Sequence, residues 1–180
     1  MRHRALPWLV LLALCAGAAD AADGARAACT LVFGQGRNTG SSGANLWDSV
    51  NEMFSAQVAA TIEAHGRRVI PLMASASSVN PAATGEMLLR KATESGCTTI
   101  VETTMFADPA AAALVVRLRV YPVLLEADAQ TGLTGARIGP PLYANQRDFE
   151  LSQATLDRVK PAVLGAQMAA EYLDRDGAAR

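Results

Sequence analysis

The chain has 180 residues, of which 51% are hydrophobic and 18% are charged. This balance argues against a disordered protein, because enough apolar side chain is present to form a core. The formal net charge of −1 argues against sequence-independent nucleic-acid binding, which depends on clustered Lys and Arg. We therefore expect one folded domain that does not bind nucleic acid.

The first 22 residues have the pattern of a secretory signal peptide. Residues 2–4 are basic, residues 6–14 form an apolar core too short to cross a bilayer stably, and Ala16-Gly17-Ala18 fits the A-x-A cleavage rule. We expect cleavage between residues 18 and 27, export to a bacterial periplasm or secretion, and no stable membrane insertion afterwards. The alternative is a lipoprotein lipidated at Cys15, although the residue before it, a leucine, stands where a small residue is expected.

The mature chain is expected to form a single domain over residues 28–173, followed by a frayed polar tail over residues 174–180. The domain begins with a bulky strand at Thr30–Phe33, a glycine- and serine-rich loop at Gly34–Gly43, and a helix at Asn45–His65 that Gly66 ends. The helix has an apolar residue every four positions, at Leu46, Val50, Phe54, Val58 and Ile62.

The glycine-rich loop invites comparison with phosphate-binding loops. The G-x-G-x-x-G pattern would need glycine at the position of Thr39, and the loop has no lysine for a P-loop. We expect a mobile loop at the carboxyl ends of parallel strands, which is the edge where α/β sheets bind ligands. The candidate residues for contact with a partner, peptide or ligand are Gly34, Gln35, Gly36, Arg37, Asn38 and Gly40.

The next elements are a second strand, a second helix and a third strand. Arg68–Leu72 contains Pro71, which favours a sheet edge. Asn80-Pro81 is typical of a helix start, and this helix should run to Ser95. Thr98–Phe106 is rich in β-branched residues and is predicted to be the third strand.

The fourth strand, Leu114–Leu125, has the clearest alternation of the chain. Leu114, Val116, Leu118 and Val120 point to one face. Val115, Arg117, Arg119 and Tyr121 point to the opposite face, which we expect to be wetter. Pro122 predicts a bulge. A last strand over residues 133–149 is interrupted by Pro140 and Pro141, and a helix over residues 152–172 contains Pro161, which either kinks it or marks its true start.

The order β-α-β-α-β-β-β-α predicts an α/β (α+β) fold. Right-handed crossovers would make the first three strands parallel, and the complete mixed sheet would have the spatial order 2-1-3-4-5, with the helices mainly on one face. Cys29 and Cys97, the two cysteines of the mature chain, come just before the first and third strands. These strands would be neighbours, so we predict a structural disulfide between the two cysteines.

Catalytic and metal-binding patterns are weak. A Ser-His-Asp arrangement would have to combine Ser41 or Ser42 of the loop with His65 at the far end of a helix. Cys29, Cys97 and His65 lack the spacing of a zinc site. We therefore expect no cofactor, no metal and no enzyme, with an unrecognised enzyme as the remaining alternative.

Taken in chain order, the elements that carry a family resemblance are Leu31–Phe33, the helix to Gly66 with Val69-Ile70, Leu88 to Gly96 with Thr98–Val101, Leu114–Val120, Asp128-Ala129-Gln130-Thr131-Gly132 and the helix after Ser152. With this order the chain resembles the TolB N-terminal-domain-like group of bacterial envelope proteins, which includes relatives of CsgG and LpoB. It differs from that group in its poor lipobox and its longer glycine-rich loop.

The resemblance implies a periplasmic adaptor that binds another envelope protein and has no catalytic residues to carry over. The alternative function is a periplasmic protein that binds a small ligand or peptide at the glycine-rich loop edge of the sheet.

Overall fold

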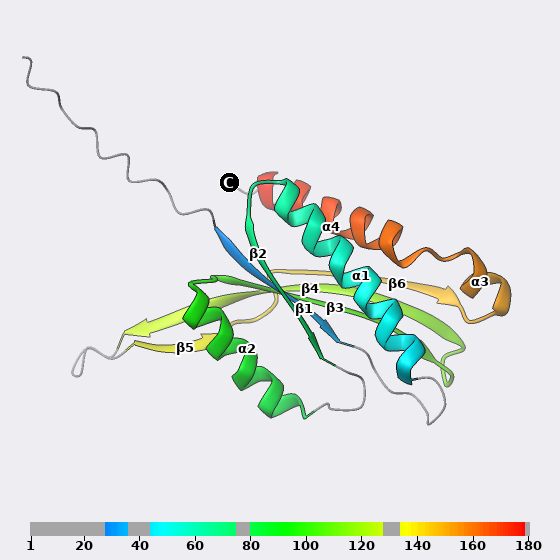
Figure 1. Ribbon diagram of the computed structural model, residues 1–180, viewed down its shortest axis with the longest axis horizontal. Coiled ribbons are helices and arrows are strands. Elements are labelled where there is room, and N and C mark those ends of the chain that lie inside the picture. Colours follow the sequence, from blue (N-terminus) through cyan, green and yellow to red (C-terminus); the bar gives the residue numbers. More distant parts are fainter. Residues whose placement is uncertain (1–27, 36–43, 75–79, 128–133, 179–180) are drawn as a thin grey trace, which may run out of the picture.

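The computed structural model describes residues 28–35, 44–74, 80–127 and 134–178 (Figure 1). The predicted signal peptide, Cys15 and residues 36–43 of the glycine-rich loop lie outside these ranges. The described residues form a six-stranded mixed sheet with four helices. In chain order the elements are β1 (Cys29–Gln35), α1 (Ala44–Ala64), β2 (Arg68–Ala74), α2 (Pro81–Ser95), β3 (Thr99–Asp108), β4 (Ala113–Ala127), β5 (Thr134–Ile138), β6 (Tyr143–Glu150), α3 (Gln153–Arg158) and α4 (Pro161–Ala178).

The strand order confirms the predicted topology. The sheet runs β2-β1-β3-β4-β5, and β6 also pairs with β4. β1 is parallel to β2 and β3, while β4 is antiparallel to β3, β5 and β6. Pro71 lies in β2 at one edge of the sheet, where a residue without a backbone N–H is tolerated.

The last predicted strand is divided into β5 and β6. Ile138 pairs with Val123 and Tyr143 pairs with Val120, so residues 139–142 lie opposite only Tyr121 and Pro122. The bulge predicted at Pro122 therefore lies on the partner strand, while β4 itself continues through the proline. Three prolines meet at this point, at positions 122, 140 and 141, and none has an N–H to continue the ladder.

The helices cover both faces of the sheet. α1 and α4 pack on one face, over Val32, Val101 and Leu118, and α2 packs on the other, over Leu31 and Ile100 (Figure 1). This arrangement refines the prediction that the helices lie mainly on one face. The chain crosses from β1 to β2 in one direction and from β2 to β3 in the opposite direction. Two crossovers of the same hand that travel in opposite directions place their helices on opposite faces.

The ends of the later helices follow their sequence signals. Asn80 Oδ1 accepts hydrogen bonds from the N–H groups of Ala82 and Ala83, and Gly96 ends α2 in the left-handed region at φ 67°. Ser152 caps the short helix α3. Pro161 is the first residue of α4, so it marks a true helix start.

The last helix extends to Ala178, through most of the segment predicted as a frayed tail. Arg67, just before β2, explains this extension, because it donates hydrogen bonds to the Tyr172 hydroxyl and to the Asp176 carboxylate. Its guanidinium also lies over the Tyr172 ring, 5.3 Å from the ring centroid. Within the described ranges, no helix is both long and apolar enough to span a membrane.

Candidate functional site

The described part of the glycine-rich loop edge consists of Gly34 and Gln35, at the end of β1. A Cβ atom on Gly34 would come within 2.2 Å of Met73 Sδ and 2.8 Å of Ser55 Cβ. Glycine is therefore required here by the close packing of β1 against β2 and α1. The other four candidate residues, Gly36, Arg37, Asn38 and Gly40, lie outside the described residues.

A buried asparagine that was not among the predicted site residues holds this end of the sheet. Asn51 in α1 is 0% exposed. Its Oδ1 accepts from Met105 N at 2.6 Å, and its Nδ2 donates to Met105 O at 2.7 Å and to Trp47 O at 2.8 Å. The last residue pair between β1 and β3 is Gly34↔Thr103, so Met105 has no partner residue in β1. The Asn51 amide makes the hydrogen bonds to Met105 that a neighbouring strand would otherwise make. The sequence signal that could have indicated Asn51 is its position, as a polar residue, next to the apolar stripe of α1.

The sheet face opposite α1 and α4 holds a small polar cluster. Arg119 pairs with Glu102 across β3 and β4 at 4.0 Å, and the Tyr121 hydroxyl donates to Glu102 at 3.0 Å. Burial and the Glu102 carboxylate raise the pKa of the Tyr121 phenol, while Arg119 lowers it. The phenol therefore remains a hydrogen-bond donor at neutral pH. Arg119 and Tyr121 lie together on the face that the alternation predicted.

Arg117 differs from the prediction of a wet face. It is only 9% exposed, and Thr104, opposite it on β3, is also buried. Phe106 and Val115, on the same face, are buried as well. The face is therefore wet around Arg119 and dry around Arg117, where its neighbours on the same face are buried.

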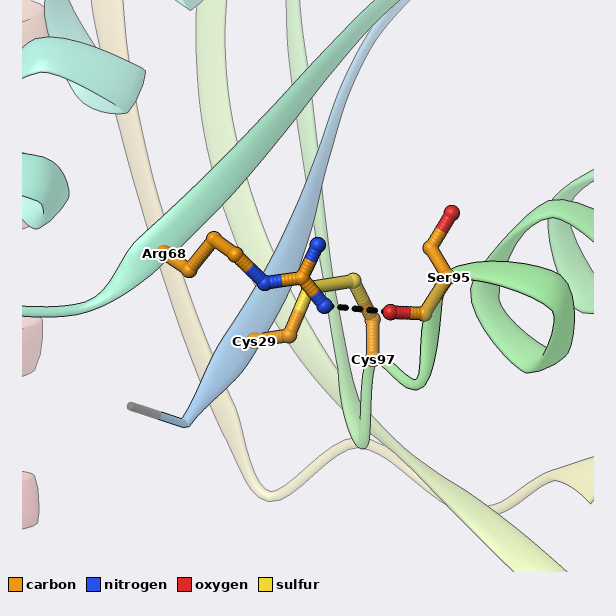
Figure 2. Close-up of a disulfide and its surroundings, with 4 residues drawn as sticks. All are labelled: Cys29, Arg68, Ser95 and Cys97. Carbon is orange, nitrogen blue, oxygen red and sulfur yellow. Dashed lines mark hydrogen bonds between the residues drawn. A yellow bond between two sulfur atoms is a disulfide. The ribbon is translucent and has the colours of Figure 1, made fainter. Parts of the chain in front are cut away.

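The predicted disulfide joins Cys29 and Cys97, with the two Cα atoms 4.3 Å apart (Figure 2). Both cysteines are buried at the start of β1 and just before β3. Arg68 Nη2 donates a hydrogen bond to Ser95 O beside the disulfide, so the first residue of β2 is tied to the end of α2. These contacts give the cysteine pair a structural position between three elements.

His65 lies just beyond α1 and is exposed, and its Nδ1 donates to Thr61 O at 2.7 Å. This contact is local to the helix end. Among the residues that the structure describes, no group of three or more His, Cys, Asp or Glu side chains is placed to hold a metal ion.

An apolar groove lies between the first half of α1 and the α3 region. Its volume is about 370 Å³. Met53 and Leu156, on opposite sides of the groove, are 49% and 41% exposed. Among the described residues that line the groove, Gln153 is the one with a polar side chain. The other lining residues are Trp47, Val50, Met53, Met105, Leu114, Leu156, Val159 and Pro161. No local pattern in the sequence indicates this groove, because its residues come from four separate segments.

A second groove separates α2 from the β4–β5 hairpin. Its volume is about 680 Å³. Leu89, Val123 and Leu125 give it an apolar floor, and Glu86 and Arg90 of α2 contribute charges. Cys97 is also among its lining residues, so the groove lies beside the disulfide.

No family model matches the chain. No curated protein matches it either. The resemblance to the TolB N-terminal-domain-like group therefore stays a prediction.

The chain is similar, at low TM-scores, to several solved structures, among them the following two. One is a variant of PelC from Paraburkholderia phytofirmans, solved as a dodecamer, with a TM-score of 0.38 and 14% identity over 82% of this chain and 86% of that chain. The other is the lipoprotein GNA1162 from Neisseria meningitidis, with a TM-score of 0.35 and 10% identity over 84% of this chain and 96% of that chain. Both TM-scores are low, so neither structure bears on the function of this chain.

Proposed function

We propose that this chain is a non-enzymatic interaction domain of the bacterial cell envelope, exported to the periplasm, that binds another envelope protein through the groove between α1 and α3. The observation that carries the proposal is the exposure of Met53 and Leu156 on either side of an apolar groove. Large apolar side chains that gather in a solvent-exposed groove are a mark of protein interaction sites.

The occupant that fits this groove is the apolar face of a partner helix. A site for a polar metabolite needs several convergent polar groups, and Gln153 is the single polar side chain among the described residues that line the groove. Methionine and tryptophan supply a large, adaptable contact surface, and two flanking helices suit a helix-in-groove contact.

Capture of a partner from an envelope fraction tests the proposal. We expect the variant Met53→Glu/Leu156→Glu to capture the partner ~tenfold less well or worse, because binding would bury two unpaired carboxylates. Leu142→Glu is the matched control, since Leu142 is 71% exposed and is not among the residues of the groove. Equal capture by the parent and the double variant would rule out the groove, provided that both have the same melting temperature.

The predicted export is tested separately by mass spectrometry of the mature N-terminus. We expect a chain that begins after a cleavage between residues 18 and 27 and carries no lipid. A diacylated Cys15 would instead make the protein a lipoprotein anchored to a membrane.

The alternative function, a small ligand or peptide held at the glycine-rich loop, also stays a prediction. Gly34 gives it no support, because packing against Met73 and Ser55 already requires a glycine there. A rise in melting temperature on addition of a metabolite or peptide would favour this alternative.

A further inference from the structure

The two outer edges of the sheet differ in how they are protected. β2 has Pro71 at its centre. β6 has eight residues with no proline, and among the described elements it pairs only with β4; its charged side chains are those of Arg147, Asp148 and Glu150. Natural proteins usually protect an edge strand of this length with proline, with charged side chains, above all lysine, or with a bulge. β6 is therefore the edge that is able to accept another strand.

The register defines which backbone groups of β6 face outward. Leu151 N donates to Ala112 O at 2.8 Å, one step beyond the pair Ala113↔Glu150. Hydrogen-bonded and non-hydrogen-bonded pairs alternate along an antiparallel ladder. The N–H and C=O groups of the alternate residues 144, 146, 148 and 150 consequently point to the free edge, where an added strand would bond to them.

We propose that two copies of this chain pair through β6 in antiparallel orientation, with the two-fold axis at Gln146. The sequence of β6 has an aromatic residue three positions before and after Gln146 and a polar residue one position before and after it, while Ala144 and Asp148 differ in type. In this register Tyr143 faces Phe149 of the second copy and Asn145 faces Arg147, so the pairing is self-complementary, as a two-fold interface requires. If the two-fold axis lay at Arg147, the two copies of Arg147 would face each other, and if it lay at Asn145, the two copies of Asn145 would face each other. Both alternatives would lose the two pairs of Tyr143 with Phe149.

The side chains of β6 are already arranged for this contact. Tyr143 and Phe149 pack against the core under α1 and α4, so the aromatic pairs would extend an existing apolar layer across the axis. Arg147 makes an ion pair with Glu171 of α4, and Asn145 donates to the same carboxylate at 2.6 Å. Each arginine therefore brings its own counter-charge to the interface. The symmetry of the strand favours a second copy over an unrelated extended peptide.

The molar mass of the mature protein in solution, measured by light scattering or sedimentation over a range of concentrations, tests the proposal. We expect a dimer for the parent. Gln146→Lys alone and Gln146→Glu alone should both be monomers, since each places two like charges opposite one another on the axis. A mixture of the two variants should dimerise again in a one-to-one ratio, because the charges are then opposite.

Gln146 is exposed, and its side chain donates to Asp148 at 3.1 Å, so Gln146→Ala controls for the loss of that contact. This variant should remain a dimer and keep the melting temperature of the parent. A monomeric parent, dimers that persist in both charged variants, or a mixture that fails to dimerise would each overturn the proposal. These outcomes are independent of partner capture in the groove, because no residue of β6 lines that groove.

Discussion

Replacing Asn51 should lower the stability of the fold by a large amount for a side chain of its size. Its amide satisfies both backbone groups of Met105, which are otherwise buried where β1 ends. Asn51→Ala leaves a buried donor and a buried acceptor unpaired, so we expect a loss of about 3 kcal/mol in the free energy of unfolding. Urea denaturation followed by circular dichroism measures this loss.

Asn80→Ala is the comparison for that experiment. Asn80 is exposed and caps only the first turn of α2, so its replacement should cost about 1 kcal/mol. If Asn51→Ala costs no more than Asn80→Ala, the Asn51 amide does not hold α1 to β3 in solution.

At the scale of elements, the contact between α1 and α4 depends on a glycine. A Cβ atom on Gly165 would approach Phe54 O to 2.6 Å, and Phe54 O is a backbone atom that cannot rotate away. Gly165→Ala should therefore push the two helices apart and cost about 1–3 kcal/mol, despite the higher helix propensity of alanine. Thermal unfolding of the variant measures the net effect.

Gly85→Ala in α2 is the matched control, because a Cβ atom there would meet nothing within 4 Å. The same substitution at this position should stabilise the protein by about 0.5–1 kcal/mol through helix propensity alone. Opposite signs for the two variants would confirm that close helix packing, and not propensity, selects glycine at position 165. A stabilising Gly165→Ala would contradict it.

For the whole molecule, the Cys29–Cys97 disulfide closes a loop with a sequence separation of 68 residues. The loop-closure model gives a stabilisation of about 4 kcal/mol for a loop of this length. Cys97→Ala should therefore lower the melting temperature by about 10 °C, as measured by calorimetry. Reductant should lower the melting temperature of the parent similarly and leave that of the variant unchanged. Two free thiols in the exported parent would show that the pairing is absent.

Much of the fold followed from local patterns in the sequence. Pro71 and the paired prolines at 140 and 141 indicated edge strands, and Asn80, Gly96 and Pro161 indicated helix ends. Each of these signals acts within a few residues along the chain, by a missing N–H, a capping side chain or a left-handed conformation. Cys29 and Cys97 come just before the first and third strands, and this position was enough to predict their disulfide. Neighbouring parallel strands begin at the same end of a sheet, so the two cysteines lie close together.

The tertiary structure alone decided what depends on separate segments that meet. The sequence placed Arg117 on the same face as Arg119, but only the folded structure shows that Arg117 is buried. The sequence showed a polar Asn51 beside an apolar stripe, but not that Met105, fifty-four residues later, would need both of its hydrogen bonds. The groove between α1 and α3 combines residues from four segments, and no local pattern records that they are adjacent. Local signals in a sequence determine the backbone conformation of residues that are close along the chain. Burial and grooves depend on contacts between distant segments, which form only when the chain is folded.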